Sequence, residues 1–99
     1  MTESEVMLEI SAYIRVKGLM IYRTNTGRRG GVSYGIKGSG DFTGLLPSGQ
    51  YIAIEAKGEG GKQSQDQKNF QERVLKNNGI YILAFSLEDI KNGLTDLEK

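Results

Sequence analysis

Two apolar segments, 50–57 and 80–85, flank a stretch of helical character, and this arrangement constrains the fold more than any other feature of the chain. The intervening helix is expected over 65–77, where Ser64 can cap its start and Asn77-Asn78-Gly79 can end it. A connection from a strand through a helix to another strand of the same sheet is almost always right-handed. We therefore expect the two apolar segments to form parallel strands. The residues of this helix expected to face the core are Phe70, Val74 and Leu75.

A hairpin is expected immediately before this crossover. Its strands, 41–46 and 50–57, are separated by the turn signal Pro47-Ser48-Gly49. Because a hairpin pairs antiparallel strands, the predicted sheet is mixed. The other expected elements are a helix over 3–17 capped by Thr2 or Ser4 and stopped by Gly18, a strand over 19–24, a brief strand over 32–36 and a short helix after Ser86. The predicted fold class is therefore α/β, a mixed β-sheet flanked by helices in the order α-β-β-β-α-β-α, in one domain over residues 1–99.

The composition restricts the chemistry that a site in this chain can use. The 99 residues include no cysteine and no histidine. A disulfide framework, thiolate ligands and imidazole ligands are therefore excluded, and any metal must be held by oxygen atoms, which favours Mg²⁺ or Mn²⁺. The N-terminus is acidic rather than basic, and no apolar run approaches the roughly 20 residues that span a bilayer. These features predict a cytoplasmic protein with no membrane partner.

The charges are distributed unevenly along the chain. No acidic residue occurs between Glu9 and Asp41, and the same stretch is rich in glycine. A basic, glycine-rich segment that leads into a carboxylate is suited to binding a phosphate backbone. The alternative is a solvated loop that is basic by coincidence. The basic residues between the two acidic positions are Arg15, Lys17, Arg23, Arg28, Arg29 and Lys37.

The segment Glu55-Ala56-Lys57 places a carboxylate and an ammonium group on one side of an apolar strand. Successive side chains of a strand alternate between faces, so Glu55 and Lys57 project together while Ala56 points away. Burying such charges is costly unless they have a use. Asp41 stands 14 residues earlier and supplies a second carboxylate. Together these groups can hold a hard divalent cation beside a fixed positive charge, a combination that suits phosphodiester hydrolysis.

The register of the hairpin decides whether Asp41 can join this set. If Leu46 pairs with Tyr51, Asp41 lies opposite Ala56 and points to the wrong face. A one-residue offset, through a three- or five-residue turn or a bulge near 42–44, brings Asp41 to the face of Glu55. We predict such an offset.

Several segments together resemble the VRR-NUC family, the virus-type replication-repair nucleases of the restriction-endonuclease-like PD-(D/E)XK superfamily. The resemblance covers essentially the whole chain and implies a restriction-endonuclease-like core. One departure is Gly40, where the superfamily often has proline. The segments that carry the resemblance are Gly38-Ser39-Gly40-Asp41-Phe42, Tyr51-Ile52-Ala53-Ile54-Glu55-Ala56-Lys57 and Lys62-Gln63-Ser64-Gln65-Asp66-Gln67-Lys68-Asn69-Phe70, with Glu3-Ser4-Glu5-Val6, Gly18 and Arg23-Thr24-Asn25.

The resemblance implies roles for the catalytic set. Asp41 and Glu55 would bind the metal, with the carbonyl oxygen of Ala56 as a neighbouring ligand. Lys57 would stabilise charge that develops in the transition state, and Gln67 would orient the water, the lysine or a phosphate. The alternatives are surface carboxylates, a structural ion pair of Lys57 with Glu55, Asp41 or Glu59, and a solvated helix face. The glutamines that compete with Gln67 are Gln63, Gln65 and Gln71.

Glu3 is a further candidate metal ligand. Its spacing places it on the helical face of Val6 and Ile10, so it can reach the site and complete the metal shell. The alternative is a favourable charge at the start of a helix. Glu5 lies on another face and is expected to be exposed.

Basic and aromatic residues supply the expected contacts to DNA. Lys62 and Lys68 would extend the basic track along the second loop and helix, and Tyr22 and Tyr34 can stack on bases or belong to the core. The residues expected to contact phosphates are Arg23, Asn25, Arg28, Arg29 and Lys37.

The function that the resemblance implies is a Mg²⁺- or Mn²⁺-dependent endonuclease that cuts branched DNA, in particular four-way (Holliday) junctions. Two symmetric cuts need two sites, so a homodimer is expected, with the first helix as its contact through Met7, Leu8 and Ile14. The resemblance also implies a phage or mobile element as the source. The alternatives are a flap or nicking nuclease that acts on one strand, a non-catalytic DNA-binding module of the same fold, and a small structural α/β domain.

Overall fold

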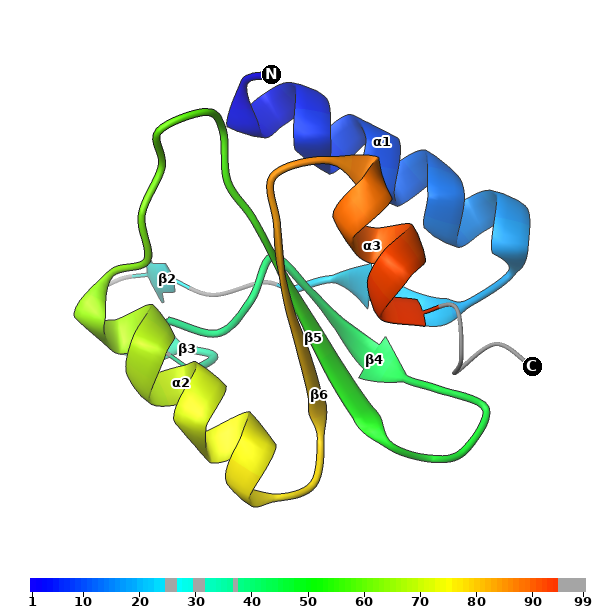
Figure 1. Ribbon diagram of the computed structural model, residues 1–99. Helices are drawn as coiled ribbons and strands as arrows, with labels where there is room; N and C mark the ends of the chain where they lie inside the picture. Colours follow the sequence, from blue (N-terminus) through cyan, green and yellow to red (C-terminus); the bar gives the residue numbers. More distant parts are fainter. Residues whose placement is uncertain (25–26, 30–31, 37, 95–99) are drawn as a thin grey trace.

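A four-stranded mixed sheet organises the part of the chain that the computed structural model describes, which is residues 1–24, 27–29, 32–36 and 38–94 (Figure 1). Its strands, in spatial order, are β1 (Met20–Arg23), β4 (Phe42–Leu45), β5 (Tyr51–Ala56) and β6 (Ile80–Ala84). β1, β4 and β5 pair antiparallel, whereas β5 and β6 pair parallel. The predicted hairpin, the predicted parallel pair and the α/β class are therefore confirmed.

Three helices flank this sheet, with α1 (Glu3–Lys17) and α3 (Leu87–Leu94) on one face and α2 (Gln65–Lys76) on the other (Figure 1). A separate two-stranded ribbon is formed by β2 (Gly27–Arg29) and β3 (Val32–Tyr34), of which the structure describes the backbone only. The sequence predicted the second of these strands but not β2. No helix of the described residues is long and apolar enough to cross a membrane.

Local sequence signals define the ends of the two longer helices. The hydroxyl of Thr2 accepts a hydrogen bond from the Glu5 backbone N–H, and the Glu5 carboxylate accepts one from the Thr2 N–H. The helix α1 ends at Gly18, whose φ of 64° lies in the left-handed region that glycine adopts at little cost. Ser64 and Gln67 form the same reciprocal cap on α2.

The larger core lies between the sheet and the pair α1 and α3. Of the three α1 residues suggested as a dimer contact, Ile14 is buried in this core and Met7 is partly buried against it, so Leu8 is the one left exposed. The buried members from the helices are Val6, Ile10, Ile14, Ile90 and Leu94, and those from the four-stranded sheet are Ile21, Phe42, Ile52, Ile54, Ala56, Ile82 and Ala84.

A smaller cluster lies between α2 and the opposite face of the sheet, where Phe70 and Val74 pack on Ala53 and Tyr81. The expectation that Leu75 also faces the core is wrong, because its side chain is 54% exposed. Phe70 and Val74 are four residues apart and share the sheet-facing side, whereas the next residue is rotated by more than a quarter of a turn.

The turn between β4 and β5 sets the register that the sequence left undecided. Leu45 pairs with Tyr51, so five residues, 46–50, connect the strands. The turn is closed by hydrogen bonds from Leu46 N–H to the Gln50 oxygen, at 2.9 Å, and from Gly49 N–H to the Leu46 oxygen, at 2.8 Å. The same register continued past Phe42 and Ile54 brings Asp41 opposite Glu55. The predicted one-residue offset is therefore confirmed, and the five-residue turn produces it.

The alternation of side chains then separates the core from the charged set. Ile54 and Ala56 face the core formed with α1 and α3, and so does Phe42. Glu55 and Lys57, and Asp41 before Phe42, must therefore lie on the face that carries α2.

The close packing of β1 on β4 predicts that Gly44→Ala destabilises the fold. A β-carbon at this position would meet the backbone oxygen of Met20, so the two strands must separate. We expect the free energy of unfolding to fall by about 1–3 kcal/mol, measured by urea denaturation. The matched control is Gly49→Ala, whose β-carbon meets no atom within 4 Å and which tests only the left-handed backbone. Equal losses in the two variants would contradict the close approach.

Candidate active site

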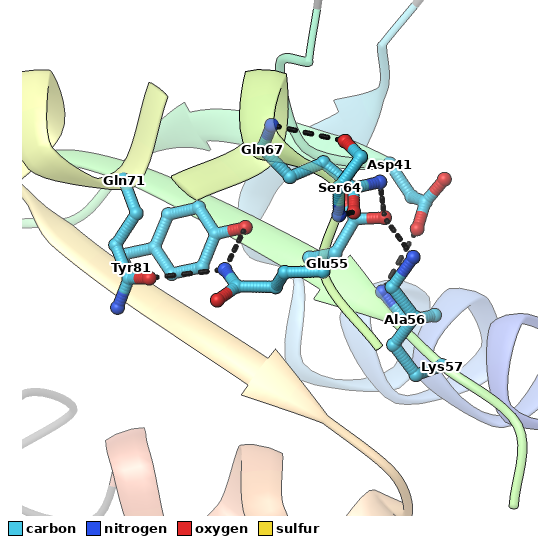
Figure 2. A network of polar contacts seen from close by, with 9 residues as sticks. Asp41, Glu55, Ala56, Lys57, Ser64, Gln67, Gln71 and Tyr81 are labelled. Atoms are coloured by element: carbon cyan, nitrogen blue, oxygen red, sulfur yellow. Dashed lines mark hydrogen bonds and ion pairs between the residues drawn. The ribbon is translucent and has the colours of Figure 1, made fainter. Parts of the chain in front are cut away.

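Glu55, on β5, is the centre of a polar cluster at the end of the sheet (Figure 2). Its side chain is buried, with 3% of the residue exposed. The Oε1 atom accepts a hydrogen bond from Gln67 Nε2 at 2.8 Å and lies 3.7 Å from Lys57 Nζ. The second oxygen, Oε2, is buried and has no hydrogen-bond partner. An isolated carboxylate oxygen in this position is unfavourable unless a further group binds it.

Asp41 brings a second carboxylate to Glu55 from the start of β4. Its Oδ2 accepts a hydrogen bond from the backbone N–H of Ala56 at 2.8 Å, and its own carbonyl oxygen accepts one from Thr24 N–H at 2.9 Å. Both ends of the aspartate are therefore fixed. In a strand, the N–H and C=O of one residue point toward the same neighbour, so the carbonyl of Ala56 is directed to the Asp41 side.

The electrostatics of the cluster favour a bound cation. Burial raises the pKa of Glu55 to about 8, and the charge of Asp41 also raises it, while the ammonium of Lys57 opposes both effects. Lys57 is thus insufficient to compensate two neighbouring carboxylates. A divalent cation would offset both the burial and the repulsion and would return Glu55 to its ionised form.

The cap of α2 fixes the orientation of the Gln67 amide. The Ser64 backbone N–H donates to Gln67 Oε1 at 2.8 Å, so the amide oxygen is committed to the start of the helix. The amide nitrogen must then face Glu55, which it reaches at 2.8 Å. One side chain therefore completes a helix cap and holds a carboxylate of the site.

The competing glutamines have other partners. Gln65 Nε2 donates to Asn69 on the exposed side of α2. Gln63 Nε2 lies 3.0 Å from Gln71 Oε1 and 3.3 Å from the hydroxyl of Tyr81. The preference for Gln67 as the glutamine of the site agrees with these contacts.

Glu3 lies at the exposed start of α1, and its charge is the smallest of the effects that raise the pKa of Glu55. Its side chain is exposed, and the first turn of α1 meets the loop after β5. There, a β-carbon on Gly58 would lie 2.7 Å from Glu3 N, and Glu59 N–H bonds to the Met1 oxygen. Among the described residues, no three Asp or Glu side chains are grouped so as to hold a metal ion.

The predicted DNA-contacting residues are only partly gathered at this site. Arg23 lies on the opposite face of the sheet, with its guanidinium 5.6 Å from the Phe42 ring centre, because it pairs with Phe42 in the register of β1 and β4. Lys62 and Lys68 are exposed, Lys62 in the loop before α2 and Lys68 in the first turns of α2. The side chains of Arg28 and Arg29, and all of Asn25, Lys37 and the Tyr34 side chain, fall outside the described parts.

Two polar groups near the cluster had no role in the sequence interpretation. Burial raises the pKa of Tyr81, the hydrogen bond with Gln63 lowers it, and the charges of Glu55 and Asp41 raise it, which places the hydroxyl within range of the pair. The crossover signal could have identified Tyr81, since the parallel register sets it beside Ala53 on the face of Glu55. The hydroxyl of Ser39 is buried without a partner, and no pattern in the sequence marked it.

Neither a protein-family model, nor a curated protein, nor a solved structure matches this chain. The fold and the site define an α/β protein in which two carboxylates, an ammonium group and an amide meet at one end of a mixed sheet. Such a set can bind a hard cation and can stabilise negative charge beside it.

The metal-free protein is expected to lose stability as the pH rises. Glu55 titrates near 4.5 in the unfolded chain and at about 8 in the folded protein. Between these values the folded protein keeps a proton that the unfolded chain releases, so the free energy of unfolding falls as the pH increases through this window. Urea unfolding in a chelator, at several pH values across the window, measures the slope. In Glu55→Gln, which cannot ionise, the slope should largely disappear, and an unchanged slope would contradict the assignment.

Proposed function

We propose that this protein is a metal-dependent endonuclease of the VRR-NUC type with a restriction-endonuclease-like core. The observation that carries the proposal is the meeting of Asp41 with Glu55, whose Oε2 is buried without a partner while Lys57 stands 3.7 Å from its other oxygen. A structural ion pair between Glu55 and Lys57 does not need a second carboxylate such as Asp41 beside it. A metal-dependent nuclease site does need one.

The residues present fit Mg²⁺ or Mn²⁺. Asp41 and Glu55 would hold the ion, and the Ala56 carbonyl, directed to the same side, would supply a neutral oxygen. Mg²⁺ is commonly held by one or two carboxylates and keeps several waters, so the pair is sufficient without Glu3. When bound, the ion supplies a Lewis acid that lowers the pKa of a coordinated water and polarises the phosphate.

The remaining residues act around this centre. Gln67 holds Glu55 Oε1 in place, so that the unpartnered Oε2 stays directed to the ion. The Lys57 ammonium lies on the same face and would neutralise charge on the non-bridging phosphate oxygens as the bond breaks. Lys62 and Lys68, both exposed near the start of α2, would contact neighbouring phosphates.

The substrate proposed for this site is branched DNA, in particular a four-way junction, cut by a homodimer. One chain contributes one carboxylate pair, so two symmetric cuts need two chains. Among the three α1 residues first suggested for the contact, Leu8 is available. A nicking or flap nuclease would use the same chemistry in one subunit.

Cleavage should require the metal and the carboxylate pair. Four-way junctions, flaps, nicked and linear duplexes are incubated with Mg²⁺, Mn²⁺ or a chelator, and the products are resolved on denaturing gels. Glu55→Ala should lose orders of magnitude in rate, and Lys57→Ala about 10²–10³-fold, while both keep DNA binding. Lys76→Ala, which removes an exposed lysine from the last turn of α2, at the end of the helix away from Gln67, is the matched control and should cleave. Retained cleavage in Glu55→Ala would refute the proposal, and symmetric junction cleavage by a sedimenting monomer would refute the dimer.

The contact from α2 to the site predicts a difference between two neighbouring glutamines. Gln67→Ala frees Glu55 Oε1 and should slow cleavage or weaken metal binding by about 10–100-fold, because outer partners orient the ligands. Gln65→Ala removes a similar amide from the same helical turn but loses only the bond to Asn69, so it should behave as the wild type. Metal-dependent rates and thermal shifts with Mn²⁺ compare the two. Equal effects would show that the helix, rather than the contact, is responsible.

A further inference from the structure

A part of the sheet on the α2 side is left uncovered by any helix of the described residues. α2 packs over β5 and β6, through Phe70 and Val74 on Ala53 and Tyr81. On β1, β4 and the first half of β5, the same face presents what we call the tyrosine face, defined as Tyr22, Thr43 and Tyr51. Tyr22 is 62% exposed and Tyr51 is 40% exposed.

The tyrosine face is continuous with the carboxylate pair. Tyr22 pairs with Thr43 across β1 and β4, and Thr43 is two residues from Asp41 on the same side of the strand. Thr24 links Thr43 to Asp41. Its hydroxyl donates to Thr43 Oγ1 at 3.0 Å, and its backbone N–H donates to the Asp41 carbonyl oxygen. Tyr51 precedes Glu55 by four strand residues, a distance of about 13 Å.

Tyr51 lies within electrostatic range of the other two members of the tyrosine face. Burial raises the pKa of Tyr51, a hydrogen bond with Thr43 lowers it, and the nearby Tyr22 raises it. The face therefore presents two exposed aromatic rings on one sheet, which is what a stacking surface needs.

A cavity of about 280 Å³ adjoins Tyr51 where α2 meets the sheet. The residues that form its wall are Ile36, Tyr51, Phe70, Arg73, Val74 and Asn77. Arg73 supplies positive charge at this wall. Asn77 uses its Nδ2 to bind the Arg73 oxygen at 2.8 Å, which leaves its amide oxygen to accept a further hydrogen bond. Aromatic rings, a guanidinium and a free acceptor are the groups that bind the face and the edge of a nucleobase.

We propose that an unpaired stretch of the DNA strand lies along the tyrosine face, with its bases stacked on Tyr22 and Tyr51 and one base in the adjoining cavity. Stacking requires bases whose faces are exposed, and those of a continuous duplex are already covered by their neighbours. Among branched DNAs, the protein would thus favour those with unpaired nucleotides a short distance from the cut, such as flaps, over a fully paired four-way junction. This inference rests on the proposed nuclease function and adds the substrate class.

Binding in a chelator tests the inference without cleavage. Fluorescence anisotropy compares a labelled branched DNA that has an unpaired arm with a fully paired duplex of equal length. Tyr22→Ala and Tyr51→Ala should each weaken binding of the first DNA by about fivefold or more and leave the duplex unchanged. Tyr22→Phe and Tyr51→Phe keep the ring and should bind as the wild type. Val16→Ala is the surface control, because it shortens an exposed side chain of α1, the helix that covers the opposite face of the sheet.

A measurement on the unaltered protein guards against variants that fail to fold. Photocrosslinking from 5-bromodeoxyuridine in the unpaired arm, mapped by mass spectrometry, should identify Tyr22 or Tyr51. Crosslinks elsewhere, or equal losses on the duplex, would overturn the inference. A change in sedimentation of Tyr22→Ala without a change in DNA binding would also overturn it and assign the face to a second copy of the chain. Wild-type protein that binds the unpaired arm through these tyrosines but never cleaves with Mg²⁺ or Mn²⁺ would refute the nuclease, not the surface.

Discussion

The burial of Glu55 beside Asp41 is the constraint around which the polar part of this structure is arranged. The pKa of this carboxyl group is raised to about 8, so its charged form needs neighbouring groups that offset the burial and the repulsion by Asp41. Lys57 supplies charge from the same strand, and Gln67 supplies a hydrogen bond from α2. One oxygen is still without a partner. Two groups, one from β5 and one from α2, therefore hold the first oxygen of the carboxylate, and the second oxygen is left for the cation proposed above.

The scaffold achieves this with rigid elements rather than loops. The carboxylate pair stands on two paired strands, and Gln67 is immobilised because its amide also caps α2 through Ser64. The apolar residues on the other side of β4 and β5 pack against α1 and α3, which fixes the strands themselves. The antiparallel pairing of β1, β4 and β5 places both Asp41 and the tyrosine face on the same side of the sheet. The positions of the carboxylate pair and of the proposed substrate contact therefore both depend on the register of β4 with its neighbouring strands.

Much of this arrangement could be predicted from local patterns. The ends of α1 and α2 follow from caps at Thr2 and Ser64, and the parallel pairing of β5 and β6 follows from the handedness of crossovers. The alternation around Glu55 indicated that Lys57 shares its face. Patterns failed where a residue's surroundings come from distant elements. Leu75 fitted an apolar stripe on α2, but its side chain is 54% exposed, and the spacing of Glu3 fitted the core stripe of α1, but its side chain is exposed.

The sequence by itself determined the order of the elements apart from β2, the absence of imidazole and thiolate ligands, and the identity of the charged residues that can meet. The tertiary structure alone decided that Asp41 lies on the face of Glu55, since a turn one residue shorter would have reversed it. It also decided that Arg23 lies on the opposite face, over Phe42. Which face a side chain occupies depends on strand register, and register is set by the hydrogen bonds of one turn and the packing of both faces rather than by local composition.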